Sequence, residues 1–244
     1  MRRARGRNRE PVGRRRRGIR RLAAALAAGS LDRVNARVGA KRVLFLGALE
    51  GAIVATLAGT PEARTPIIDQ LAREGVRYTR AYTTAPVCSP SRSALITGMY
   101  ATTIGAHQHR TKNKSPLPEG VRILPDRLRE AGYFTGNIVK FPESAGVKGT
   151  GKTDWNFIPQ SPAFDTRDWA DLKSHQPFYA QVNFNETHRD FRAPPEADPA
   201  KVVLPPYYPD HPVIRQDWAA YLDSARDLDR KVGRVLAQLK ADGL

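Results

Sequence analysis

Two short apolar segments, each followed at once by polar residues, restrict the fold of this chain more than any other feature. Tyr133 to Val139 is typical of a buried strand that ends at Lys140. Gln176 to Phe184 is typical of a second strand, and residues 185–188, ending in His188, follow it directly. Parallel sheets place their chemistry at the carboxyl ends of their strands. We therefore expect Lys140 and His188 to lie at one edge of such a sheet.

Helical periodicity alternates with these strands. The strongest case is the segment from Asp217 to Leu239, which has a wide apolar face. Alternation of this kind favours an α/β fold with a mostly parallel sheet sandwiched by helices. The remaining predicted helices cover 67–72, 91–96 and 123–128, and the remaining predicted strands cover 43–46 and 76–84.

The basic charge of the chain lies almost entirely at its N-terminus. The formal net charge is +16, and residues 1–42 account for +13 of it through 14 Arg and one Lys against two acids. The segment has few apolar residues before position 22 and lacks interleaved aromatics, so neither a packed core nor nucleic-acid binding is expected from it. Three interpretations stay open: a poor export signal, a disordered basic tail, or sequence upstream of the real start. The last two are favoured, and 43–244 is treated as the globular part.

Cys88 is the only cysteine in the chain, which excludes an internal disulfide and a metal site built on paired cysteines. It is either an inert buried thiol or a single reactive centre. Arg92 follows one helical turn later, and Gly98 ends the predicted helix. Cys88 would then lie at a helix N-terminus, where unpaired N–H groups attract anions. These neighbours favour a reactive centre.

The segment Cys88-Ser-Pro90-Ser-Arg92, followed by a small-residue helix ending in Thr97-Gly98, resembles the signature of the type I sulfatases of the alkaline-phosphatase-like superfamily. The order of segments is most similar to sulfamidases and heparan N-sulfatase-like members. In that family a formylglycine-generating enzyme or an anaerobic maturase oxidises the cysteine to Cα-formylglycine, and the hydrated aldehyde attacks sulfur. The resemblance implies a Ca²⁺-dependent hydrolase of sulfate esters or N-sulfates, acting on a sulfated sugar or an aryl sulfate.

The resemblance also assigns roles to single residues. Cys88, as formylglycine, would be the nucleophile and a calcium ligand, and Arg92 would stabilise the aldehyde hydrate and the sulfate. Lys140 would bind sulfate, and His188 would contact sulfate or the leaving oxygen. The family's histidine two residues after this lysine is replaced here by Pro142. The residues expected to line the substrate pocket are His107, His109, Asp154 and Trp155.

The chain departs from the family pattern at the calcium ligands. The strand at 43–46 runs into Gly-Ala-Leu-Glu instead of paired aspartates, which leaves Glu50 as the only acid near that place. The family's later Asp-Asn pair, second catalytic lysine and smaller C-terminal domain find no match, so the resemblance covers 61–244, about the first half of a sulfatase. Truncation, a frameshift or divergence would each explain this. We expect little activity from the chain as given, and the alternative function is an inactive sulfatase fragment or pseudoenzyme.

The sequence also bears on location. No run of 18 apolar residues exists, so no membrane span is expected. The family is periplasmic or secreted, whereas the weak export signal leaves a cytoplasmic location open.

Overall fold

The computed structural model describes residues 42–48, 60–75, 82–160 and 162–244. Its centre is a four-stranded sheet in the order β1-β4-β2-β3, and every neighbouring pair of strands is parallel. This confirms the expected α/β architecture with a parallel sheet. The strands are β1 (Arg42–Ala48), β2 (Phe134–Lys140), β3 (Thr166–Asp168) and β4 (Phe178–Phe184).

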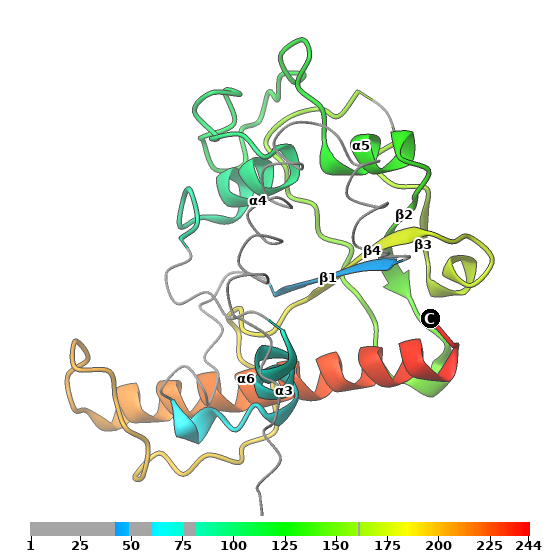
Figure 1. The fold of residues 1–244 in the computed structure, drawn as a ribbon. Helices are drawn as coiled ribbons and strands as arrows, with labels where there is room; N and C mark the ends of the chain where they lie inside the picture. The colour runs from blue at the N-terminus through cyan, green and yellow to red at the C-terminus, as the bar shows by residue number, and fades with distance from the viewer. Residues whose placement is uncertain (1–41, 49–59, 76–81, 161) are drawn as a thin grey trace, which may run out of the picture. The chain divides into compact units, whose positions relative to one another are not determined.

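Helices cover both faces of the sheet, with α4 and α5 on one side and α3 and α6 on the other (Figure 1). The predicted helices are all present, and α6 is longer than its apolar periodicity indicated because Pro212 starts it. None of the helices in the described ranges is long and apolar enough to cross a membrane. The predicted strand at 76–84 falls mainly outside the described residues. The helices are α3 (Pro66–Glu74), α4 (Cys88–Thr97), α5 (Leu124–Glu130) and α6 (Pro212–Ala241).

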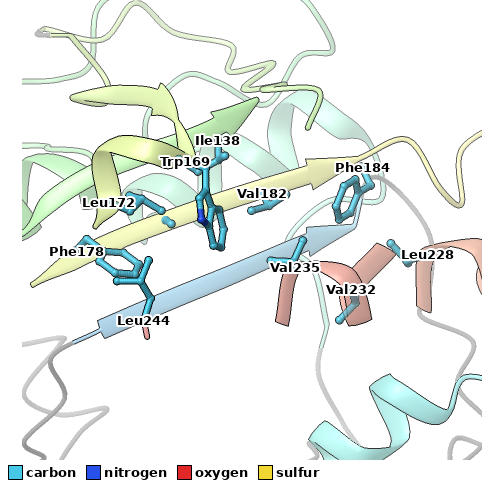
Figure 2. Packing of buried hydrophobic residues seen from close by; sticks show 11 residues of the cluster. Ile138, Trp169, Leu172, Phe178, Val182, Phe184, Leu228, Val232, Val235 and Leu244 are labelled. Atoms are coloured by element: carbon cyan, nitrogen blue, oxygen red, sulfur yellow. The ribbon is translucent and has the colours of Figure 1, made fainter. Parts of the chain in front are cut away.

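The two faces of β4 serve different purposes. Side chains alternate across a strand, so Phe178, Ala180, Val182 and Phe184 share one face. They pack into the main core with side chains of α6 and with Trp169 (Figure 2). The opposite face carries Asn183, and Asn137 lies on the matching face of β2, where both amides are buried. The same alternation that builds the core therefore presents amide side chains to α4.

A carboxylate of α6 caps the start of α3. Asp229, which is buried, accepts hydrogen bonds from the backbone N–H groups of Ile67 at 3.2 Å and Ile68 at 2.8 Å. The first N–H groups of a helix have no partner within the helix, and a side-chain oxygen satisfies them here in place of a local cap. Thr65, the residue before α3, makes no such side-chain bond to the helix backbone.

Asp229→Ala is expected to lower the free energy of unfolding by about 1–2 kcal/mol, because it leaves two partly buried donors of α3 without this acceptor. Burial raises the pKa of Asp229 even though Ile68 and Ile67 donate to it. The ionised form is therefore held at a cost that grows as the pH rises through the pKa of the folded protein. Asp229→Asn, which keeps one acceptor without the charge, is expected to lose less than alanine. Urea unfolding at pH 7 measures both, and equal stability of the alanine variant and the parent would contradict the capping role.

Candidate active site

Cys88 begins α4, as the sequence predicted. Val87 before it is extended, and Gly98 ends the helix in the left-handed conformation at φ 68°. The thiol is 7% exposed and takes part in no disulfide. A second contact fastens the helix, since Ser93 Oγ accepts a hydrogen bond from the backbone N–H of Asn156 at 3.0 Å. Cys88 is therefore the first residue of α4, and the positive end of a helix dipole favours an anion there.

Two cationic side chains reach the sulfur from loops distant in sequence. The Lys152 ammonium lies 3.8 Å from Cys88 Sγ, and the Arg110 guanidinium lies 3.9 Å from it. Together with the helix N-terminus they make the surroundings of Cys88 strongly positive. Such an environment suits a substrate with a negatively charged head group.

One carboxylate holds both cations. Asp154 accepts a bidentate pair of hydrogen bonds from Arg110, at 3.1 Å from Nε and 3.0 Å from Nη2. The same carboxylate lies 3.6 Å from Lys152 Nζ. Burial raises the pKa of Asp154, but the hydrogen bonds and charge of Arg110 together with the charge of Lys152 outweigh it and hold that pKa below its usual value. Asp154 is therefore ionised at neutral pH and joins the two cations.

Arg92 is held by the sheet. Its guanidinium donates to Asn183 Oδ1 at 3.1 Å and to the backbone carbonyl of Lys152 at 3.1 Å. Asn183 donates in turn to Asn137 Oδ1 at 3.1 Å, and Asn137 donates to the carbonyl of Gly151 at 2.8 Å. Because both amides are buried and mutually satisfied, this chain of hydrogen bonds fixes the arginine and the 151–152 backbone together.

Two glycines allow the segment before Lys152 to lie directly on the strand ends. A Cβ at Gly149 would meet the carbonyl oxygen of Ile138 at 2.1 Å, closer than any real contact. Gly151 has φ 65°, and its Cβ would lie 2.5 Å from a methyl group of Val139. No larger residue fits at Gly149 without moving the backbone. The segment consequently passes close over β2 and brings Lys152 back toward α4.

The two residues predicted at the ends of strands, Lys140 and His188, make other contacts. The Lys140 ammonium forms an ion pair with Asp168 at 2.6 Å, and its side chain is 77% exposed. This is a surface pair between β2 and β3, and the described contacts of Lys140 do not include Cys88. The sulfate-binding role of Lys140 stays a prediction. His188 is exposed and its ring contacts the carbonyl of Arg189. No described contact joins it to Cys88.

The expected pocket residues separate into three groups. His107 and His109 are exposed on the loop that carries Arg110. Asp154 lies at the site, but as the partner of two cations. Trp155 is 6% exposed and stacks on Phe157 with ring centroids 5.5 Å apart, in an apolar cluster beneath α4. A ring buried to this extent offers little surface to a sugar, so the structure lends no support to a pocket role for Trp155, which stays a prediction.

The described residues around Cys88 do not fit a calcium site. Ca²⁺ takes six to eight oxygen ligands. Across residues 42–48, 60–75, 82–160 and 162–244, no group of three or more His, Cys, Asp or Glu side chains is placed to hold a metal ion. The charged neighbours of Cys88 are mostly cations, and the carboxylate of Asp154 is already paired with them. The predicted ligand Glu50 lies outside the described residues.

Sequence reasoning missed Lys152 and Arg110 as neighbours of the thiol. Within the segment 149–155, the sequence singled out only Asp154 and Trp155, as residues expected to line the substrate pocket. The signal that could have identified Lys152 was the pair Gly149 and Gly151 directly before it, because closely spaced glycines indicate close approach of backbones. Arg110 carried no comparable signal, since it follows two histidines in a loop of mixed polarity.

Comparisons with known proteins identify relatives of this chain. A family model described as Sulfatase matches residues 50–244. The ulvan-active sulfatase of Formosa agariphila is 30% identical over 234 residues, which cover 74% of this chain and 37% of that protein. Human N-sulphoglucosamine sulphohydrolase is 25% identical over 246 residues, which cover 85% of this chain and 49% of that protein. The chain spans half or less of the length of these two relatives.

Solved structures support the fold. A protein from a glycosaminoglycan-metabolism locus of Bacteroides thetaiotaomicron superposes with a TM-score of 0.63 at 17% identity, covering 83% of this chain and 58% of that one. The phosphonate monoester hydrolase of Agrobacterium radiobacter superposes with a TM-score of 0.60 at 18% identity, covering 84% of this chain and 60% of that one. At such identities the likeness concerns the fold alone. The family model covers most of the chain, so the chain belongs to the sulfatase family.

Proposed function

We propose that this chain carries the nucleophile and the sulfate-binding cations of a formylglycine-dependent sulfatase. The observation that supports this most directly is the position of the only cysteine. Cys88 begins a helix, and two cations reach its sulfur from separate loops at 3.8 and 3.9 Å. An ordinary buried thiol needs no such surroundings, whereas an anionic ester that must approach a nucleophile does.

A sulfated sugar is the favoured class of substrate. Two of the relatives are named for ulvan and for N-sulphoglucosamine. A further structural neighbour, with a TM-score of 0.53, was solved in complex with its substrate, D-glucosamine-2-N,6-O-disulfate. A sulfate ester and an N-sulfate present the same –SO₃⁻ head group to the cations at Cys88. The sugar itself would have to be recognised by other residues.

The residues of the chain suit the steps of this reaction. After a maturase oxidises Cys88 to formylglycine, one hydroxyl of the aldehyde hydrate loses its proton and attacks sulfur, and the bond between sulfur and the ester oxygen breaks. The second hydroxyl of the sulfated hydrate then loses its proton, the carbon–oxygen bond to sulfate breaks, and the aldehyde re-forms and takes up water. In this proposal Arg92 and Lys152 neutralise the sulfuryl oxygens as the bond between sulfur and the ester oxygen breaks, which the contact of Lys152 with Cys88 Sγ supports. The leaving oxygen takes a proton to become the alcohol, and His188 stays a proposal for that role. In the family, bound Ca²⁺ adds further positive charge at the sulfate.

The alternative, an inactive fragment or pseudoenzyme, also has an observation in its favour. The described residues hold no cluster of acidic ligands near Cys88. Without a metal, the charge that builds up on the sulfuryl group is met by side chains alone. This predicts that Cys88 can be converted while turnover stays low.

Co-expression with a formylglycine-generating enzyme tests the proposal. Peptide mass spectrometry is expected to show Cys88 converted to the aldehyde, and the converted chain is then assayed with millimolar Ca²⁺ on an aryl sulfate and on N-sulfated glucosamine. A thiol that stays unmodified with several maturases would overturn the mechanism. Full conversion without turnover would support the pseudoenzyme or fragment alternative.

A further inference from the structure

The pairing of Arg110 with Asp154 at the thiol is not accounted for by the sequence signature. In the described part of the chain, the non-glycine residues with positive φ are Arg64, Arg110 and Asp154. Arg110 has φ 53° and Asp154 has φ 50°, so both partners of one ion pair adopt a conformation that non-glycine residues rarely take. Strained backbone of this kind persists where the surroundings enforce it, and it is concentrated at functional sites.

The carboxylate of Asp154 offsets the repulsion between two cations that lie near Cys88 Sγ. Arg110 and Lys152 both come within 4 Å of one sulfur atom, at 3.9 and 3.8 Å, and two cations so close repel each other. Asp154 Oδ2 lies 3.0 Å from Arg110 Nη2 and 3.6 Å from Lys152 Nζ, and this offsets the repulsion. One carboxylate facing two cations leaves a net positive charge beside Sγ.

Exposure distinguishes the two members of the pair. The side chain of Asp154 is 13% exposed, whereas that of Arg110 is 53% exposed. The bidentate geometry fixes the plane of the guanidinium, because the fork of an arginine matches the two oxygens of a carboxylate. Arg110 therefore lies at the solvent side of the thiol with its orientation set from behind by Asp154. An anion that approaches Cys88 from solvent would meet it.

We infer that Arg110 is an anion-contacting residue of this site, aimed at the nucleophile by Asp154, and that the ligand is the –SO₃⁻ group of the substrate. The inference rests on the proposed function for the identity of the ligand. It gives Asp154 the part of a positioning residue in place of a sugar contact. Arg92, fixed by Asn183, and Arg110, fixed by Asp154, would bind the sulfate from two sides.

The test uses the unconverted chain, in which Cys88 is the only thiol. Iodoacetate is anionic and iodoacetamide is neutral, so the ratio of their alkylation rates reports anion attraction at Sγ and cancels differences in access. The ratio is expected to exceed that of the denatured chain and to fall about three- to tenfold in Arg110→Gln. Arg110→Lys, which keeps the charge but loses the fork, should fall less. Arg122→Gln removes an arginine from a surface pair with Glu130 and serves as the charge-matched control.

The variant Asp154→Asn tests whether Asp154 orients Arg110 or only contributes a negative charge. Removing a negative charge should raise the ratio if Asp154 acts only as a charge, whereas the ratio should fall if Asp154 aims Arg110. We expect a fall, accompanied by weaker protection of Cys88 against iodoacetamide by sodium sulfate. An unchanged ratio in Arg110→Gln would overturn the inference, and a rise in Asp154→Asn would overturn the positioning role. Because this assay needs no formylglycine, failed conversion of Cys88 would count against the proposed function and leave this result intact.

Discussion

Replacing Cys88 with alanine is expected to abolish sulfate-ester turnover, with kcat falling by at least about 10⁴-fold from that of the converted chain. Alanine has no sulfur to oxidise, so neither the aldehyde nor its hydrate can form. The remaining cations can still bind sulfate but have no nucleophile to assist. The measurement is the hydrolysis of an aryl sulfate at high enzyme concentration after co-expression with a maturase, with millimolar Ca²⁺ present.

Two further readouts make this prediction independent of how fast the parent chain turns over. Labelling with an aldehyde-reactive hydrazide should be present in the converted parent and absent in Cys88→Ala. Thermal unfolding should change little, because a buried thiol exchanged for a methyl group removes a single atom. Turnover that persists in a folded, unlabelled Cys88→Ala protein would mean that another group is the nucleophile.

Lys152→Ala and Lys140→Ala form a matched pair with opposite expected results. Lys152 lies 3.8 Å from the sulfur, so its loss should lower kcat/KM by about 10²–10³-fold, as the loss of one preorganised electrostatic donor does. Lys140 makes an exposed pair with Asp168, and exposed pairs contribute little. Its replacement should change kcat/KM by less than about threefold, since exposed pairs of this kind are weakly coupled to the rest of the protein.

The pair also controls for net charge, because each variant removes one lysine. Hydrogen exchange of residues 149–155 would show whether Lys152→Ala has disturbed the loop instead of the chemistry. A large loss in Lys140→Ala with little loss in Lys152→Ala would restore the strand-end lysine as the sulfate-binding residue. Equal losses would indicate that both act through the position of the 140–152 segment.

Local patterns in the sequence determined much of the fold. The apolar residues of Gln176 to Phe184 alternate with period two, and the structure has β4 there with alternate side chains in the core. The face of Asp217 to Leu239 has helical period, and α6 lies there against the same core. Gly98 marks the end of α4 because it adopts φ 68°, which glycine takes without strain. These features depend on neighbours in sequence and could be predicted from them. The three-residue β3 was missed because so short a strand shows no periodicity.

The proposed nucleophile, Cys88, was also identified from the sequence, through the resemblance of the segment from Cys88 to Arg92 to the sulfatase signature. The neighbours of Cys88, Lys152 and Arg110, could not be predicted from the sequence, because they come from loops whose course depends on the packed sheet. Lys140 ends a strand, as expected, but points to Asp168 on β3. Lys152 reaches the thiol because Gly149 and Gly151 let the backbone lie against β2 and because Asn137 and Asn183 hold it there. The polar residues that end a strand can be recognised in the sequence. The path of the loop that passes back over the strand depends on contacts between residues far apart in the chain.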